Sequence, residues 1–405
     1  MGRGRYLSAT WRMTVLTLRQ GYQDWHVCLH FDSIAQYRSP DYRTDSHFKM
    51  AAKSSNYYSK ALMFAVFLSS FHLTTTMNLL PIEEQLIWIS NTDGVALFRT
   101  PILTLLPNGD LLAFVEARKY SSGDAGAKFI AMKRSTNQGL VWGPSEYILD
   151  DFHAQDGVNT GAVLFDSDTN TLFLLYSYCG HLANCVPGPD SQAAGSYMIA
   201  SEDFGYSWSK PVNVKDLIPG VTSLEPIAFG PGYGLQKQHQ PNKGRLIACG
   251  HTSEYVVRTM LCLYSDDHGK TWAVNKRFYS IPFNNTKVAH DLVPGEVQVV
   301  ELPNGTLFMT VRNTHGYRCN CRMQMVSYDG GETFPLRNAF FDENLIDPNC
   351  FASMMRHKDM LFFSNPASTS HRVNMTVRWS LDYGSSWPGS VIIHEGGNRP
   401  KPAGY

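Results

Sequence analysis

The chain has 405 residues, enough for two average domains or one large all-β domain. Lys and Arg together number 35, and so do Asp and Glu. This balance argues against a nucleic-acid partner, because such proteins normally carry a basic excess. Hydrophobic residues make up 43% of the chain, enough for a sizeable core, and charged residues only 17%. The 32 Gly, 21 Pro, 20 Tyr and 22 Phe favour many short strands and tight turns over long helices.

The N-terminal part of the chain is predicted to hold a targeting signal. Lys53 and Lys60 precede an apolar run at residues 61–68 (ALMFAVFL). A basic stretch followed by an apolar core of this length is typical of a signal peptide, and the core is too short to span a bilayer. A buried strand is the alternative. Translation from Met50 would place the signal normally, with cleavage expected near residues 74–76.

Three segments follow from this interpretation: a doubtful extension (residues 1–49), a signal region (residues 50–76) and a folded domain (residues 77–405). Sequons of the form N-x-[ST] support entry into the secretory pathway and are predicted glycosylation sites. Their asparagines are Asn284, Asn304 and Asn374.

Cysteines outside the extension are odd in number, which predicts at least one free thiol. They are Cys179, Cys185, Cys249, Cys262, Cys319, Cys321 and Cys350. Cys179 and Cys185 are spaced to close a small disulfide loop. His315 with Cys319 and Cys321 invites a zinc interpretation, but the spacing is wrong for a C-x₂-C knuckle, so we expect no metal.

An octapeptide of the form S-x-D-x-G-x-[ST]-[WF] recurs along the chain. Clear copies begin at residues 201 (SEDFGYSW), 265 (SDDHGKTW), 327 (SYDGGETF) and 380 (SLDYGSSW), and a degenerate copy begins at residue 135 (STNQGLVW). Successive copies start 53 to 66 residues apart.

Each position of the octapeptide has a physical role. Asp can bond the backbone two residues on, Gly accepts a positive φ, and the terminal aromatic can enter the core. Alternating runs before the copies, such as residues 245–249 and 260–264, place each octapeptide between two outer strands. A period near 60 with about four strands is typical of propeller blades. A calcium loop is the alternative, but no copy carries the alternating acidic ligands and closing Glu of an EF-hand.

The octapeptide resembles the Asp-box of the sialidase family, and the resemblance extends from about Leu79 to Tyr405. The FRTP sequence at residues 98–101 is similar to the family's F-R-I-P, with Thr in place of Ile. Segments similar to the lysosomal sialidases of animals in particular are residues 114–129, 230–238 and 372–380. Asp-boxes also occur in other propellers, including sorting receptors. The FRTP sequence and the set of arginines described below narrow the resemblance to sialidases. The resemblance implies an all-β, six-bladed β-propeller of the sialidase type.

Sialic acid carries a carboxylate on its anomeric carbon, and arginine supplies bidentate, permanently charged donors for such a group. The family binds it with three arginines, which by resemblance are Arg99, Arg312 and Arg372. Arg378 lies close to Arg372 and is its rival. Arg118 is a further candidate for the substrate pocket. For any single arginine, an ordinary surface position is the alternative.

Glycoside cleavage needs a proton donor for the leaving oxygen. Resemblance assigns this acid/base role to Asp124, on a Gly-flanked loop, where burial and the anionic substrate are expected to help keep it protonated. A loop carboxylate without a catalytic role is the alternative. A carboxylate nucleophile would meet the substrate's own carboxylate, and sialidases use a tyrosine instead. Glu296 resembles the base that activates this tyrosine, and Glu301 is its rival.

Other reaction classes find no support, because G-x-S-x-G, Walker and H-E-x-x-H motifs are absent from the sequence. The glycines at 230, 232 and 234 miss the dinucleotide fingerprint. We therefore expect no cofactor.

The family places its tyrosine beyond the fifth Asp-box, whereas this sequence ends at Tyr405, so the last blade is expected to be incomplete. Two hypotheses follow. In the first, the chain is an exo-α-sialidase that removes terminal sialic acids, with retention, from glycoproteins, oligosaccharides and glycolipids such as gangliosides. In the second, it is an inert propeller that binds sialosides or a partner protein.

Resemblance to the lysosomal members of the family has further implications. It implies association with the protective carboxypeptidase cathepsin A, and sialylated glycoconjugates as the other partners. It also implies a lysosomal location reached through the secretory pathway, with association with the lysosomal or plasma membrane as an extension of that hypothesis.

Overall fold

The computed structural model describes residues 9–10, 13–20, 23–28, 34–35, 83–92, 94–181, 185, 192–252, 258–281 and 291–396. The predicted signal region and Asn284 lie outside these residues. Among the described residues, no helix combines the length and hydropathy needed to cross a bilayer. Two short 3₁₀ helices occur there, η1 (Val214–Leu217) and η2 (Leu336–Asn338).

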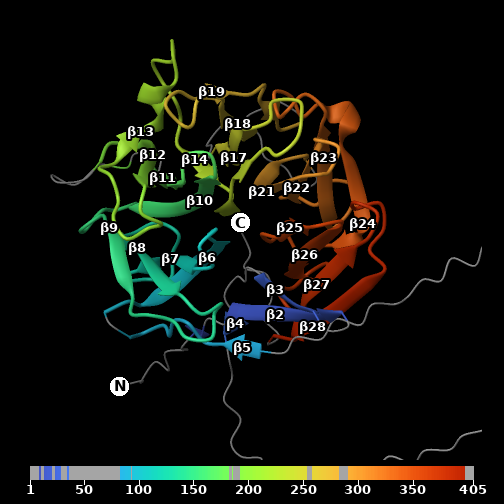
Figure 1. Ribbon diagram of the computed structural model, residues 1–405, viewed down its shortest axis with the longest axis horizontal. Helices are drawn as coiled ribbons and strands as arrows, with labels where there is room; N and C mark the ends of the chain where they lie inside the picture. Colours follow the sequence, from blue (N-terminus) through green and yellow to red (C-terminus); the bar gives the residue numbers. More distant parts are fainter. Residues whose placement is uncertain are drawn as a thin grey trace, which may run out of the picture.

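Five antiparallel blades make up the described part of the domain (Figure 1). The first contains β6 (Leu97–Leu105), β7 (Leu111–Arg118), β8 (Lys128–Ser135) and β9 (Glu146–Asp150). The second contains β10 (Val158–Asp166), β11 (Thr171–Tyr178), β12 (Gly195–Ser201) and β13 (Val212–Asn213), with β15 (Gly232–Tyr233) parallel to β10. The third contains β14 (Ile227–Phe229), β16 (Leu235–Gln236), β17 (Leu246–Thr252), β18 (Thr259–Ser265), β19 (Ala273–Val274) and β20 (Phe278–Tyr279).

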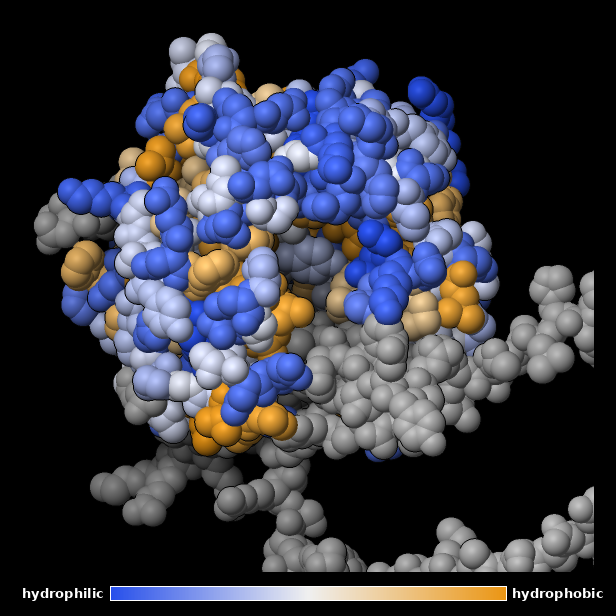
Figure 2. All heavy atoms as spheres, viewed as in Figure 1, coloured by the Kyte–Doolittle hydropathy of each residue, from blue (hydrophilic) through white to orange (hydrophobic). Residues whose placement is uncertain are grey.

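The fourth blade contains β21 (Pro294–Glu301), β22 (Leu307–Asn313), β23 (Cys321–Ser327) and β24 (Phe340–Ile346). The fifth contains β25 (Ser353–His357), β26 (Met360–Pro366), β27 (Met375–Ser380) and β28 (Gly389–His394). Figure 1 shows the blades arranged around a common centre, and Figure 2 shows that the face seen in this view is hollowed near its middle. The expectation of an all-β propeller is confirmed, with five blades in the described residues.

A further sheet has the strand order β3-β2-β5 and joins β2 (Met13–Gln20) and β3 (Gln23–Cys28) to β5 (Glu83–Gln85). In Figure 1 it lies between β28 and the first blade. The side chain of Gln85 accepts a hydrogen bond from Trp142 Nε1 at 3.0 Å, which connects this sheet to the first blade. β1 (Ala9–Thr10) and β4 (Ile34–Ala35) form a separate pair.

The octapeptide copies, called Asp-boxes here after that resemblance, occupy the turns between the third and fourth strands of the blades, as the sequence predicts. In the copy at residues 265–272, Ser265 Oγ donates to Asp267 Oδ1 at 2.8 Å and accepts from the Gly269 N–H at 2.8 Å. Asp267 also accepts from the Thr271 N–H at 2.9 Å and the Thr271 hydroxyl at 2.7 Å. Gly269 has φ +81°, and the preceding His268 has φ 62°. The glycine is therefore required by the left-handed backbone of this turn.

The aromatic residue that ends an Asp-box packs against the neighbouring blade. Trp208 lies edge-on to Phe114 of β7 with 6.1 Å between ring centroids, and Trp272 lies edge-on to Phe173 of β11 with a separation of 6.5 Å. Trp272 is 2% exposed. Burial of a large ring stabilises the contact by about 1.5–3 kcal/mol, so the Asp-boxes couple successive blades.

Disulfides join Cys179 to Cys185, as expected, and also Cys249 to Cys262 and Cys319 to Cys321. Cys249 and Cys262 are directly opposite each other on β17 and β18. The remaining thiol of the domain is the buried Cys350, in keeping with the odd count. Because Cys319 and Cys321 are bonded to each other, they offer no thiolate for the zinc alternative.

Candidate active site

Arg118 organises the loop that carries Asp124. It ends β7, and its guanidinium is buried. Nη1 donates to the carbonyls of Ser122 at 2.7 Å and Gly123 at 2.8 Å, while Nη2 lies 2.8 Å from Asp124 Oδ1 and 3.1 Å from Glu116 Oε2. The sequence places Arg118 in the substrate pocket, but its donors are engaged by the loop. The structure therefore gives it the geometry of a support for Asp124.

Arg99 reaches the same region from β6. The register of β6 against β7 shifts between Arg99 and Ile102, and Thr100 has φ 51°, so the Thr-Pro of FRTP forms a bulge. Pro101 is suited to such a position because it has no N–H to give to a ladder. Arg99 lies opposite Glu116 in the register and is half-buried. Its charge acts on Asp124, which places the two predicted residues in one cluster.

Asp124 is half-buried and lies among cations. Burial alone raises the pKa of Asp124 and is the largest single effect, but the positive charges of Arg118, Arg99 and His181 outweigh it, so the pKa lies below its ordinary value. Burial acts in the expected direction, toward the protonated form, but the neighbouring charges of the protein itself favour the carboxylate. Three neighbouring cations overcome desolvation.

A second cluster lies on the fourth and fifth blades. Glu296 of β21 and Arg312 of β22 form an ion pair with 2.6 Å between Oε2 and Nη1. Arg312 Nε also donates to Asn349 Oδ1 at 2.6 Å, and Arg372 Nη2 lies 3.5 Å from the Asn349 carbonyl oxygen. Burial lowers the pKa of Arg312, but the nearby Glu296 charge outweighs burial and the opposing charge of Arg372. The structure thus brings Glu296, Arg312 and Arg372 together.

Glu301 and Arg378, the alternatives to Glu296 and Arg372, make contacts outside the second cluster. Glu301, at the opposite end of β21, accepts from buried Lys237 Nζ at 2.6 Å and from the Gln238 N–H at 2.5 Å. Its carboxylate therefore fastens a loop. Arg378 donates to Asn365 Oδ1 at 3.1 Å. Neither contact involves the Glu296 cluster, so the geometry favours Glu296 over Glu301 and Arg372 over Arg378.

Two histidines link the clusters across the propeller. His181 acts electrostatically on Asp124 of the first blade and on His251 of the third. His251 in turn lies in the field of Arg312 of the fourth blade. Burial, reinforced by these cations, holds the pKa of His251 well below its ordinary value, so its imidazole is neutral. The arginines and carboxylates of three blades therefore surround one centre.

Sequence reasoning missed Glu116, His181 and His251 as members of this region. Glu116 is unusual, because it is a charged residue within a strand that is buried at every position, and this could have marked it as a candidate. His181 lies inside the loop between Cys179 and Cys185, where the sequence predicted only a disulfide, and His251 lies in no motif that the sequence singled out.

Of the predicted glycosylation sites, Asn304 is exposed in the turn between β21 and β22, and Asn374 is half-buried with φ 56°.

The fold and this site together define a β-propeller whose first, fourth and fifth blades supply interacting arginines and two carboxylates. Residues 109–400 match the family described as BNR repeat-like domain. The chain is 28% identical to a sialidase of Micromonospora viridifaciens, over 77% of the chain and 48% of that protein. It is also 28% identical to sialidase-4 of Homo sapiens, over 58% of the chain and 49% of that protein. The chain thus spans about half the length of these relatives.

Among solved structures, the Hadza microbial sialidase Hz136 superposes with a TM-score of 0.60 at 25% identity, and the match covers 75% of this chain and 60% of that one. The chain belongs to the BNR repeat-like domain family, and the relatives and solved structures that it resembles are sialidases.

Proposed function

We propose that the chain is an exo-α-sialidase that hydrolyses terminal sialic acids from glycoproteins, oligosaccharides and glycolipids with retention. The observation that carries the proposal is that the first blade supplies Arg99 and Asp124, the fourth and fifth blades supply Glu296, Arg312 and Arg372, and His181 and His251 link the two clusters electrostatically. Sialidase relatives from bacteria, animals and a fungus support the reaction class.

Charge explains how this site would select its substrate. Arg99, Arg312 and Arg372 would bind the sialic acid carboxylate, and guanidinium groups do so with paired hydrogen bonds. A bound anion would also offset the cations around Asp124 and favour the protonated form of that carboxyl. Asp124 could then protonate the leaving oxygen. Glu296 is proposed as the base that takes the proton of a tyrosine nucleophile.

The experiment is hydrolysis of a fluorogenic α-sialoside by the full chain, with the released sugar observed by proton NMR. The proposal predicts initial release of the α-anomer, because two displacements preserve configuration. Initial release of the β-anomer would contradict retention. Binding of the sialoside without release would favour the inert propeller.

We also propose that the propeller has six blades. Support comes from the β3-β2-β5 sheet, which in Figure 1 lies between the fifth and first blades. An experimental structure of the full chain would test this, and a closed five-bladed ring would refute it.

Location and partners form a further part of the proposal. We infer a lysosomal protein, reached through the secretory pathway, that carries N-glycans and associates with cathepsin A. The sequons support this, and Asn304 is exposed. Expression in animal cells should give a product whose gel mobility shifts with endoglycosidase and which co-purifies with cathepsin A. An unshifted cytosolic product would contradict the routing, and separate elution would contradict the partner.

A further inference from the structure

His181 is held in place by a buried carboxylate. It follows β11 in the loop closed by the Cys179–Cys185 disulfide. Asp156 accepts a hydrogen bond from the His181 N–H at 2.5 Å and lies 3.0 Å from the ring nitrogen Nδ1. The Asp156 side chain is 0% exposed, whereas that of His181 is 39% exposed. Both the backbone and the ring of His181 are therefore fixed by one group at the edge of the site.

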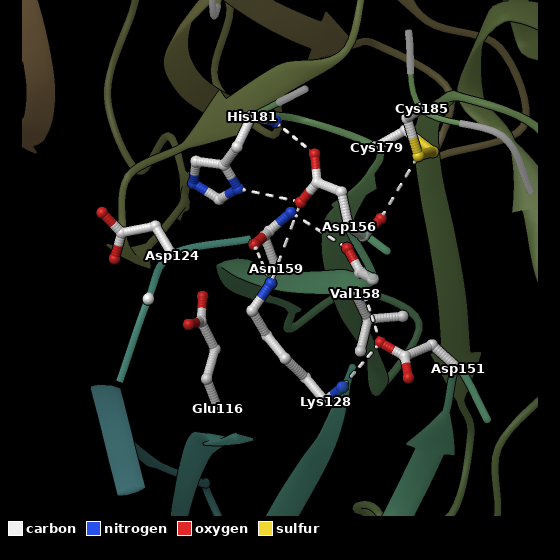
Figure 3. Close-up of polar contacts among 12 residues, drawn as sticks. Glu116, Asp124, Lys128, Asp151, Asp156, Val158, Asn159, Cys179, His181 and Cys185 are labelled. Atoms are coloured by element: carbon white, nitrogen blue, oxygen red, sulfur yellow. Dashed lines mark hydrogen bonds and ion pairs between the residues drawn. A yellow bond between two sulfur atoms is a disulfide. The ribbon is translucent and has the colours of Figure 1, made fainter. Parts of the chain in front are cut away.

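The other side of the imidazole is turned toward the catalytic loop. In Figure 3 the ring lies between the carboxyl groups of Asp156 and Asp124. The electrostatic interaction between His181 and Asp124 agrees with this view. A cationic ring in this position stabilises the carboxylate form of Asp124 over the carboxylic acid.

We propose that the His181–Asp156 pair is a positioning element that controls the protonation of Asp124 during hydrolysis. The inference rests on the proposed sialidase function. In the first half-reaction, the tyrosine oxygen bonds to the anomeric carbon as the bond to the leaving oxygen breaks; Glu296 takes the tyrosine proton, and the Asp124 carboxyl gives its proton to the leaving oxygen. In the second, the oxygen of a water molecule bonds to the anomeric carbon as the bond to the tyrosine oxygen breaks; the Asp124 carboxylate takes a proton from the water, and Glu296 returns the proton to the tyrosine oxygen. The acid and base forms must both be accessible, and the imidazolium shifts their balance toward the base.

The surrounding charges allow the contribution of His181 to be separated from the rest. Asp124 is faced by Arg118 from the end of β7, by Arg99 from β6 and by His181. His181 is faced by Asp156 and, toward the third blade, by His251. Behind Asp156, the buried Lys128 Nζ lies at 4.0 Å. Arg118 and Arg99 are guanidinium groups, so His181 is the imidazole of the set that faces Asp124.

Two substitutions separate charge from shape. His181→Gln removes the cation but keeps a side chain that can hydrogen-bond Asp156. His181→Lys keeps a cation next to Asp156. The proposal predicts that the alkaline limb of kcat/KM moves to higher pH in His181→Gln, because Asp124 holds its proton more tightly without the cation. Above the optimum, kcat/KM relative to its plateau should rise about 2- to 5-fold. In His181→Lys, the limb should stay close to that of the unmodified chain.

The chain offers a matched control in His268 and Asp166. Their ring-to-carboxylate distance is 2.8 Å, and their side chains are 41% and 0% exposed, much like the His181–Asp156 pair. Val158 is the first residue of β10, at the end near the site, and Asp166 is the last. The His268–Asp166 pair therefore lies about 26 Å along the strand from the end near the site. His268→Gln should leave the pH profile of kcat/KM unchanged.

A second readout does not depend on turnover. Carbon-13 NMR of aspartate carboxyls, with Asp124 assigned by comparison with Asp124→Asn, measures the titration midpoint directly. We expect a higher midpoint in His181→Gln than in the unmodified chain and in His181→Lys. Equal midpoints in all three proteins would overturn the inference, as would a raised KM with no displacement of the pH limb. Failure of the unmodified chain to hydrolyse any sialoside would refute the proposed function, while the carboxyl titration would still decide the role of His181.

Discussion

Arg118→Lys tests whether the arginine behind Asp124 is required for catalysis. A lysine ammonium can keep one anionic partner, but it cannot span the Ser122 and Gly123 carbonyls at 2.7 and 2.8 Å and both carboxylates as the guanidinium does. A hydrogen bond to a charged group contributes about 1.5–3 kcal/mol. The side chain of Asp124 is 38% exposed, so solvent weakens its share of the loss. We therefore expect a loss of about 2 kcal/mol of transition-state stabilisation, or roughly 30-fold in kcat/KM.

The assay is steady-state hydrolysis of a fluorogenic sialoside, with thermal unfolding measured in parallel. Arg134→Lys is the matched control, because Arg134 also bridges a carboxylate and a carbonyl, Asp110 Oδ2 at 2.7 Å and Phe204 O at 2.7 Å. Arg134 lies outside both site clusters. The control should lower the unfolding temperature and leave kcat/KM within about 2-fold of the unmodified chain. Equal losses of kcat/KM in the two variants would refute a specific role for Arg118.

Three further predictions use the site and the Asp-boxes. Asp124→Asn should reduce kcat/KM by roughly 100-fold or more on a natural sialoside but far less on a substrate with a very good leaving group, and equal losses would exclude proton donation. Glu296→Gln should lower kcat by several powers of ten while leaving sialoside binding measurable, and a near-normal kcat would exclude Glu296 as the base. The Asp203 pKa is lowered to about 2 by hydrogen bonds from Ser207 and Ser201, so its stabilisation is fully present above pH 4 and lost as pH falls toward 2. Asp203→Asn should unfold at a lower temperature at pH 7 but converge with the unmodified chain near pH 2, and a constant difference would contradict this.

The fold was accessible from the sequence because the Asp-box is a local structure. Ser265, Asp267 and Gly269 lie within five positions of one another, so their contacts need no knowledge of the rest of the chain. The disulfide between Cys249 and Cys262 was not foreseen, because it depends on the register of β17 against β18.

The site was only partly accessible. FRTP and the other motifs located Arg99, Arg312 and Glu296, and the structure brings each into a cluster of opposite charge. The lowered pKa of Asp124 was not foreseen, since it depends on Arg118, Arg99 and His181 together. His181 lies 57 residues beyond Asp124 in the chain. Only the packing of the second blade against the first brings His181 and Asp124 together, and no local sequence pattern predicts that packing.

The central claim is that this propeller recognises the carboxylate of a sialoside and cleaves the glycosidic bond beside it. The most direct measurement compares kcat/KM for sialoside hydrolysis by the full chain with that of Arg99→Lys. We predict measurable release by the unmodified chain and a loss of about 30- to 1000-fold in the variant, since a lysine cannot replace a bidentate guanidinium. Release at the same rate by both proteins would contradict the account, and so would the absence of release by the unmodified chain.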